Sequence, residues 1–231
     1  MAHTDYDQYR DEYGKQLDRA VSFAGPDHDF FTRAKADELV RLVRRHLDDP
    51  RKLAALDVGC GIGLSDRHLA GRFRSLTGTD VSPGVLETAA QANPDVRYEL
   101  AERERLPFGD GNFDLAFAVC VVQVVPPEER PRFVAELARV TRPDGLVVVF
   151  EHNPYNPLTR LVVRRCEFGG DARMLGMAEA ERLLQWNGVT PVERGYVLLF
   201  PSRRRRVLAV ERALHRLPLG AQYYVAGRPA A

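Results

Sequence analysis

Apolar residues follow two different patterns along the chain. Over residues 29–47 they recur every three or four positions, with arginines on the opposite side, which predicts an amphipathic helix. The pair Asp49-Pro50 ends that pattern. From Leu53 onward, short apolar runs alternate with amphipathic stretches, as β-strands alternate with helices. The sequence therefore predicts an α/β fold whose mostly parallel sheet carries helices on both faces.

The individual runs predict seven strands. The long apolar run 113–122 suits a central strand that is buried on both faces. The last two runs come in hairpin-like order, which suits one antiparallel edge strand. The expected strands are 54–58, 76–80, 96–100, 113–122, 146–150, 196–200 and 221–225. The expected helices between them are 64–73, one starting at Pro83, 127–140, 179–187 and 207–217.

The length of 231 residues fits one α/β domain with modest additions. We expect residues 1–50 to form N-terminal helices that belong to the same domain. Residues 51–231 would form the core, with an insertion at 152–177 that is rich in Asn, Pro and Arg.

Three glycines at alternate positions follow the first predicted strand: Gly59, Gly61 and Gly63. They allow a sharp turn and let a ligand lie against bare main chain at the carboxyl ends of the strands. A dinucleotide fingerprint needs G-x-G-x-x-G, but Leu64 stands where its last glycine belongs. About 20 residues on, Asp80 can accept both hydroxyls of a ribose. The turn predicts an adenosine ligand without pyrophosphate, and S-adenosylmethionine fits because its tail is an amino acid.

Four segments in order resemble motifs of class I S-adenosylmethionine-dependent methyltransferases. They are LDVGCGIG (56–63), GTDVS (78–82), RLPFGDGNFD (105–114) and LARVTRPDG (137–145). The resemblance is to the methyltransferase type 11 branch, which includes ubiquinone and menaquinone methyltransferases, and it covers about residues 53–150. It implies a Rossmann-like, doubly wound fold with an N-terminal helical lid. It also implies methyl transfer from S-adenosylmethionine to an O or N atom of a small metabolite, leaving S-adenosylhomocysteine.

The resemblance implies which residues hold the methionine end of the cofactor. The main chain of the turn at Gly59, Cys60 and Gly61 would face the methionine part. Asp57 would orient its ammonium group. Cys120, at the end of the fourth predicted strand, would border the cofactor.

The nucleoside end is implied in the same way. Asp80 would hold the ribose hydroxyls and Val81 would pack against adenine. Glu102 aligns with the acidic residue that hydrogen-bonds the adenine amino group, and the backbone N–H of Arg103 would be its neighbour.

The N-terminal helices supply further candidates. Arg33 or Lys35 can reach the methionine carboxylate from a lid, while the plainer alternative for each is an exposed basic residue on a helix. Tyr13 and the tyrosines before it form a packing stripe or, as a second interpretation, part of a lid over the substrate.

The acceptor side depends on the residues after the fourth and fifth predicted strands. His152 is a candidate general base, because the pKa of histidine suits neutral pH; alternatively it only hydrogen-bonds its own loop. Asn153 and Tyr155 are candidate acceptor contacts. Many relatives carry a His-His pair where this chain has Gln123, which removes one possible base and makes Gln123 a candidate substrate contact.

Composition excludes several classes of protein. The net charge of +1 gives no global reason to expect nucleic acid or a membrane as a partner. The arginine run 203–206 is interpreted as a solvated helix start. The three cysteines lack the spacing of a zinc site, so no metal is expected. Without a signal peptide or an apolar run of about 18 residues, we expect a soluble cytoplasmic protein.

Three other functions stay open at this point. They are a regulatory protein that binds S-adenosylmethionine without transferring its methyl group, an NAD-dependent reductase and a nucleic-acid methyltransferase. The sequence does not specify the oligomeric state.

Overall fold

The computed structural model describes residues 19, 27–165, 172–200, 202 and 205–230. Its strands are β1 (Ala54–Val58), β2 (Ser75–Asp80), β3 (Arg97–Leu100), β4 (Phe113–Val119), β5 (Thr141–His152), β6 (Val189–Val197) and β7 (Gln222–Pro229). Its helices are α2 (His28–His46), η3 (Pro50–Lys52), α3 (Asp66–Leu69), α4 (Pro83–Ala92), α5 (Arg130–Val140), α6 (Pro157–Arg165), α7 (Met177–Trp186) and α8 (Arg205–Leu214). Tyr13 lies outside the described residues.

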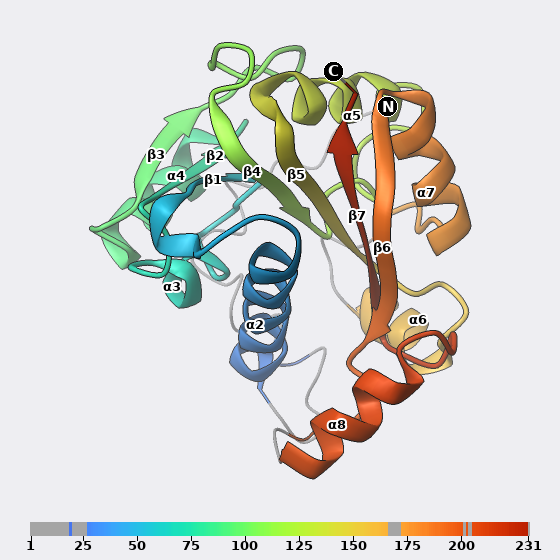
Figure 1. The fold of residues 1–231 in the computed structure, drawn as a ribbon. Helices are drawn as coiled ribbons and strands as arrows, with labels where there is room; N and C mark the ends of the chain where they lie inside the picture. The colour runs from blue at the N-terminus through green and yellow to red at the C-terminus, as the bar shows by residue number, and fades with distance from the viewer. Residues whose placement is uncertain (1–18, 20–26, 166–171, 201, 203–204, 231) are drawn as a thin grey trace.

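The strands form one seven-stranded sheet in the order β3-β2-β1-β4-β5-β7-β6 (Figure 1). Strands β1 to β5 pair in parallel, whereas β7 runs antiparallel to both β5 and β6. This confirms the predicted Rossmann-like, mostly parallel sheet with one antiparallel strand. That strand, β7, lies beside the edge strand β6. The strand order reverses between β1 and β4, and ligands bind beyond the carboxyl ends of the strands at such a point.

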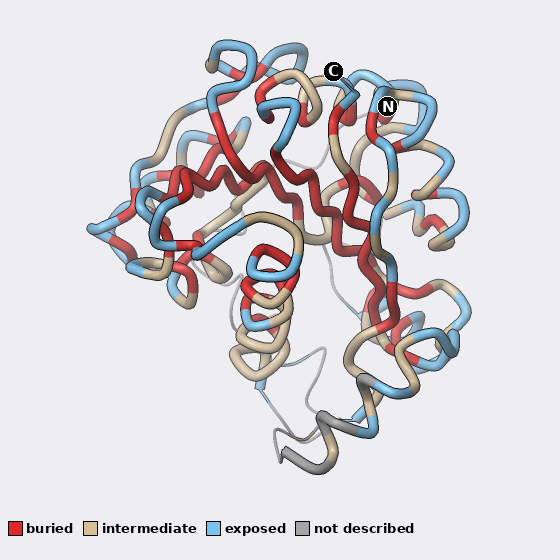
Figure 2. The backbone as a smooth tube through the Cα atoms, in the orientation of Figure 1, coloured by how far each residue is buried: buried red, intermediate tan, exposed pale blue. Residues whose placement is uncertain are grey.

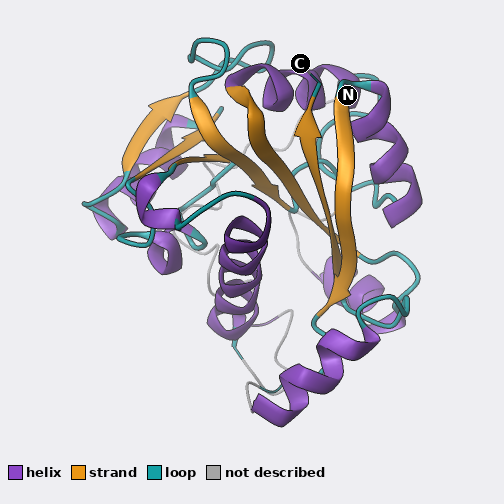
Figure 3. Ribbon diagram, in the orientation of Figure 1, coloured by secondary structure: helices purple, strands orange, loops and turns teal. Residues whose placement is uncertain are grey.

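Helices cover both faces of the sheet (Figure 3). Leu56 and its alternate neighbours in β1 belong to the apolar cluster that includes Leu137 of α5 and Leu184 of α7. Ala55 belongs to the opposite cluster, with Leu39 of α2. All of β1, and β4 up to its last residue, are consequently buried, as Figure 2 shows for the centre of the sheet.

Helix α2 confirms the amphipathic pattern expected over residues 29–47. Asp27 caps its first turn by accepting a hydrogen bond from the Phe30 amide at 3.0 Å. Arg41 and His46 anchor it to Glu193 of β6 at 2.6 and 2.7 Å. Helix α2 is thereby held across one face of the sheet. No helix of the described residues is long and apolar enough to cross a membrane.

Several predicted bounds differ from the structure. The strand expected over 113–122 ends at Val119 because Cys120 adopts a left-handed backbone with φ of 61°. The strand expected over 196–200 instead spans Val189–Val197. A bulge between Pro191 and Glu193 hides its alternation, and an edge strand tolerates this proline. The helix expected over 64–73 is only one turn, Asp66–Leu69.

Candidate cofactor and acceptor site

The turn after β1 depends on its three glycines. Gly59, Gly61 and Gly63 have φ of +76°, +54° and +74°, a region that side-chain-bearing residues rarely adopt. The amides of Gly59 and Cys60 donate to the Thr79 carbonyl at 2.8 and 3.0 Å, which ties the turn to the end of β2. A Cβ added at Gly61 would meet nothing within 4 Å. The main chain at Gly61 therefore faces open space.

A buried polar network supports the turn from behind. A Cβ added at Gly63 would lie 2.4 Å from Asn93 Nδ2 and 2.7 Å from the Tyr98 hydroxyl. Asn93 Nδ2 donates to the Gly63 carbonyl at 3.2 Å, and the Tyr98 hydroxyl donates to Asp66 Oδ2 at 2.9 Å. Sequence reasoning missed Asn93, Tyr98 and Asp66. Asn93 and Tyr98 reach Gly63 from a later part of the chain, Tyr98 also binds Asp66, and no local pattern marks these contacts.

Asp57 is buried in β1 beside this network. Its Oδ1 atom has no hydrogen-bond partner among the described residues. Burial, and then the charge of Asp66, raises the pKa of Asp57 well above its ordinary value, and burial raises the pKa of Asp66 to about 6. Lys35 of α2 acts in the opposite direction on Asp57. A buried carboxyl oxygen without a partner fits a cationic ligand group.

The nucleoside-side candidates also meet at this edge. Asp80 ends β2, where its Oδ2 accepts from the Gly61 amide at 3.0 Å and its Oδ1 accepts from the Ser82 amide at 3.1 Å. Val81 is 43% exposed. Glu102 and Arg103 are exposed in the loop after β3, two and three residues beyond the Leu100 that pairs with Asp80. The structure thus brings this group to one end of neighbouring strands.

Polar side chains also meet where β4, β5 and β7 come together. Cys120 Sγ lies 4.0 Å from His152 Nε2 and accepts from Gln222 Nε2 at 3.4 Å. His152 Nδ1 lies 2.8 and 3.1 Å from the two amide atoms of Gln123. Burial lowers the pKa of His152 to about 4, so its imidazole is neutral at physiological pH. The structure therefore places the candidates Cys120, Gln123 and His152 together.

Glu151 was missed by sequence reasoning, although a carboxylate that ends an apolar run was a usable signal. It is fully buried, and its Oε1 accepts from the Val122 amide at 2.7 Å. Its Oε2 has no partner among the described residues, and neither does Oε1 of Gln222. Burial raises the pKa of Glu151 to about 8, so the carboxyl is largely neutral at pH 7.

Other candidates hold the neighbouring loop or lie further out. Asn153 Nδ2 donates to the carbonyls of Pro218 and Gly220 at 3.0 and 2.8 Å, and its Oδ1 accepts from the Tyr155 amide. These contacts use its amide to fix the loop before β7. Tyr155 is exposed. Arg33 lies 3.6 Å from Asp29 in an ion pair on α2.

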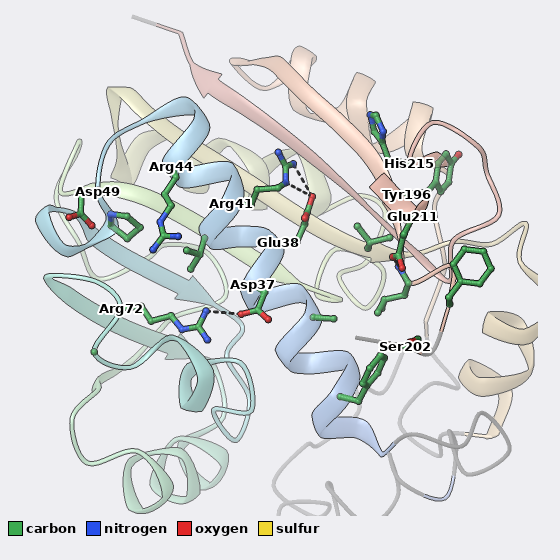
Figure 4. A pocket seen from close by; sticks show the side chains of 18 of the residues that line it. Asp37, Glu38, Arg41, Arg44, Asp49, Arg72, Tyr196, Ser202, Glu211 and His215 are labelled. Atoms are coloured by element: carbon green, nitrogen blue, oxygen red, sulfur yellow. Dashed lines mark hydrogen bonds and ion pairs between the residues drawn. The ribbon is translucent and has the colours of Figure 1, made fainter. Parts of the chain in front are cut away.

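A hollow of about 650 Å³ lies away from these residues, between α2 and the end of β6 (Figure 4). Four of its charged side chains form two ion pairs. Asp37 binds Arg72 at 2.8 Å and Glu38 binds Arg41 at 2.8 Å. It contains none of the residues expected to hold the cofactor.

Comparison with known proteins supports the same interpretation. Residues 56–149 match the family described as Methyltransferase domain. A malonyl-[acyl-carrier protein] O-methyltransferase of Halorhodospira halophila is 30% identical, over 85% of this chain and 67% of that protein. A demethylmenaquinone methyltransferase of Renibacterium salmoninarum is 26% identical, over 68% of this chain and 66% of that protein. A second malonyl-[acyl-carrier protein] O-methyltransferase, from Serratia marcescens, is 38% identical, but the match covers only 36% of its length. The chain thus spans about a third to two thirds of these relatives.

Solved structures share the fold. The magnesium protoporphyrin IX methyltransferase of Synechocystis with bound S-adenosylhomocysteine has a TM-score of 0.65 at 16% identity, covering 97% of this chain and 98% of that one. A methyltransferase of Thermotoga maritima has a TM-score of 0.68 at 19% identity, with the same coverage. Together with the 30%-identical relative, the glycine turn and Asp80 at the strand ends lead to one assignment. The chain belongs to the S-adenosylmethionine-dependent methyltransferase family, and S-adenosylmethionine is its cofactor.

Proposed function

We propose that the protein transfers the methyl group of S-adenosylmethionine to an oxygen or nitrogen atom of a small acceptor. The observation that carries the proposal is that the glycine turn with Asp80 and the imidazole of His152 lie at the carboxyl ends of parallel strands of one sheet. The first group suits the cofactor and the second suits a nucleophile that must lose a proton. The 30%-identical relative is an O-methyltransferase, which favours oxygen as the acceptor atom.

The residues at the methionine end fit the cofactor. Asp57 Oδ1, buried without a partner, would accept from the ammonium group, and that cation would lower the raised pKa of the carboxyl. The open main chain at Gly61, between Cys60 and Gly59, would lie against the methionine part. Cys120 would border it. When bound, the cofactor supplies a methyl group already activated by its sulfonium.

The remaining cofactor contacts come from the strand ends and from α2. Asp80 would hold the ribose hydroxyls, with the exposed Val81 against adenine. Glu102, with Arg103 beside it, would reach the adenine amino group. From α2, Lys35 would meet the methionine carboxylate, since its charge already acts on Asp57 and His152. Arg33 is the second candidate for that role, because its Nε is buried without a hydrogen-bond partner among the described residues.

His152 would act on the acceptor. When Nδ1 carries the proton and donates to Gln123 Oε1, Nε2 keeps a free lone pair and faces Cys120. That nitrogen would take the proton from the acceptor as the new bond to carbon forms and the bond from carbon to sulfur breaks. Positioning supplies on the order of 7–11 kcal/mol of the barrier. A general base raises the rate by about 10²–10⁴-fold. Because the low pKa of His152 makes it a weak base, we expect a gain near the lower end of that range.

Two further parts of the proposal concern the cellular compartment and the domain organisation. Among the described residues the thiols of Cys60 and Cys120 are free, which suits a reducing compartment and supports our proposal of a cytoplasmic protein. We also propose that residues 1–50 belong to the same domain as the core, because the apolar face of α2 is part of the core cluster.

The test is methyl transfer from labelled S-adenosylmethionine to a metabolite extract, compared between wild type, His152→Gln and His68→Gln. We expect the first variant to lose about 10²-fold in rate while still binding S-adenosylhomocysteine. His68 lies on α3 and pairs with Asp29, so its variant serves as the matched control and keeps the wild-type rate. Cofactor binding without transfer to any acceptor would favour a regulatory role instead.

A further inference from the structure

A surface of leucines and arginines lies on α6 and on the segment between α8 and β7. Its leucines are 38% to 61% exposed, although side chains of this kind are normally withdrawn from water. Exposed arginines stand beside them. We call this surface the leucine–arginine face; its members are Leu158, Arg160, Leu161, Arg164, Arg216, Leu217 and Leu219.

The two parts of the face are held together by hydrogen bonds. Asn156 Nδ2 donates to the Leu219 carbonyl at 2.8 Å, and Thr159 Oγ1 donates to the Ala221 carbonyl at 2.8 Å. Figure 1 shows α6 beside the C-terminal end of α8. The leucines of α6 and those near the start of β7 therefore form one surface.

The helical geometry of α6 places Leu161 on its outer side and Arg164 next to that leucine. Thr159 and Val163, one turn apart, are buried against the protein. At 100° per residue, Leu161 points almost directly away from that buried side, and Arg164 lies beside it. The outer side of α6 is thus apolar at its centre and cationic at its margin.

The charge of this region is one-sided, unlike that of the whole chain. Residues 152–165 and 212–230 contain no Asp or Glu. Arg205 and Arg206 begin α8, at the end of the helix further from α6. The net charge of +1 is an average that conceals a local cationic face.

We propose that the leucine–arginine face docks the protein on the surface of a bilayer that contains anionic phospholipids. Leucines among arginines are the composition of segments that lie in the membrane interface, where the apolar side chains enter the headgroup region and the cations meet lipid phosphates. An acidic protein would match the charge equally well. However, leucine is under-represented among residues that carry protein–protein binding energy, so the exposed leucines favour the bilayer.

The leucine–arginine face lies close to the end of β5 that carries His152. Helix α6 follows β5, which ends at His152, and Leu219 precedes Gln222, which pairs with His152 across β5 and β7. The face therefore adjoins the acceptor side of the sheet edge. Resting on the proposed function, this arrangement would present the His152 site to acceptors held in the membrane.

The experiment is co-sedimentation of the full chain with vesicles. Phosphatidylcholine vesicles are compared with vesicles of mixed phosphatidylcholine and phosphatidylglycerol. We expect binding to the anionic vesicles, weakened by added salt because salt screens exposed charges. Each arginine near such a surface contributes about fivefold to partition, so the double change Arg160→Gln, Arg164→Gln should weaken binding about 30-fold. Leu161→Ser and Leu219→Ser should each weaken it about 10-fold.

Matched controls come from other surfaces. Arg97→Gln changes an exposed arginine on the distant edge strand β3, and Trp186→Ser changes an exposed apolar side chain on α7. Both should bind vesicles as wild type does. No binding to anionic vesicles, or equal binding by face and control variants, would overturn the proposal. So would salt-sensitive binding to an acidic carrier protein with none to lipid. S-adenosylhomocysteine titration of each variant separates these outcomes from failure of the proposed function.

Discussion

Replacing Glu151 with Gln should make the protein more stable at alkaline pH. Glu151 is fully buried at the end of β5, and burial raises its pKa from 4.5 to about 8. The native state therefore keeps a proton on this carboxyl over a range of pH in which the unfolded chain has released it. Gln resembles the protonated side chain and keeps an oxygen that can accept from the Val122 amide.

The size of the effect follows from proton linkage. When the pKa of a group is higher in the native state than in the unfolded chain, its contribution to the free energy of unfolding is fully present below the pKa of the unfolded chain. That contribution is lost as pH rises toward the pKa of the native state. Here that window runs from 4.5 to about 8. Each pH unit inside it changes the free energy of unfolding by up to about 1.4 kcal/mol. Between pH 5 and pH 8, wild type should lose about 3 kcal/mol relative to Glu151→Gln.

The assay is urea unfolding of both proteins at the two pH values, since the difference between them cancels the titration of all other groups. Glu128→Gln, at an exposed position on the loop before α5, is the matched control and should show no such dependence. If the stability difference between wild type and Glu151→Gln is the same at both pH values, Glu151 is ionised in the native protein and the reasoning fails.

Two further predictions concern the turn and the imidazole. In urea unfolding, Gly63→Ala should destabilise the protein by roughly 2–4 kcal/mol, because the added Cβ would clash with Asn93 and Tyr98. Gly71 has a similar φ of +71° but open space around it, so Gly71→Ala should destabilise the protein by only about 1–2 kcal/mol. The rate of methyl transfer should show no loss from protonation of His152 between pH 6 and pH 8, because its pKa is about 4 and the base form is present throughout. A rate that falls with a midpoint near 6.5 as pH decreases would show that His152 titrates as an ordinary histidine or takes no part as the base.

The parts of the fold that sequence predicted well are those set by local pattern. The strand at 54–58 and the turn that follows it need only an apolar run and glycines, and Asp80 ends the next strand. His152 and Gln123 could be brought together because the carboxyl ends of parallel strands share one edge.

What sequence could not supply depends on contacts between distant segments. Asn93 reaches Gly63 from the end of α4, and Gln222 reaches Cys120 from a strand that lies a hundred residues further along the chain. The strand β6 was misplaced because a bulge and an edge proline interrupt its alternation. The net charge of the chain does not reveal the leucine–arginine face, because acidic residues elsewhere cancel its arginines in the total.

The most direct test of the account is calorimetric titration of wild type and Asp80→Ala with S-adenosylhomocysteine and, in parallel, with NAD. We predict that wild type binds S-adenosylhomocysteine and not NAD, and that Asp80→Ala weakens binding by at least tenfold. The loss reflects the ribose hydrogen bonds to a charged group, each of which contributes about 1.5–3 kcal/mol. Tight binding of NAD with no binding of S-adenosylhomocysteine would contradict the account.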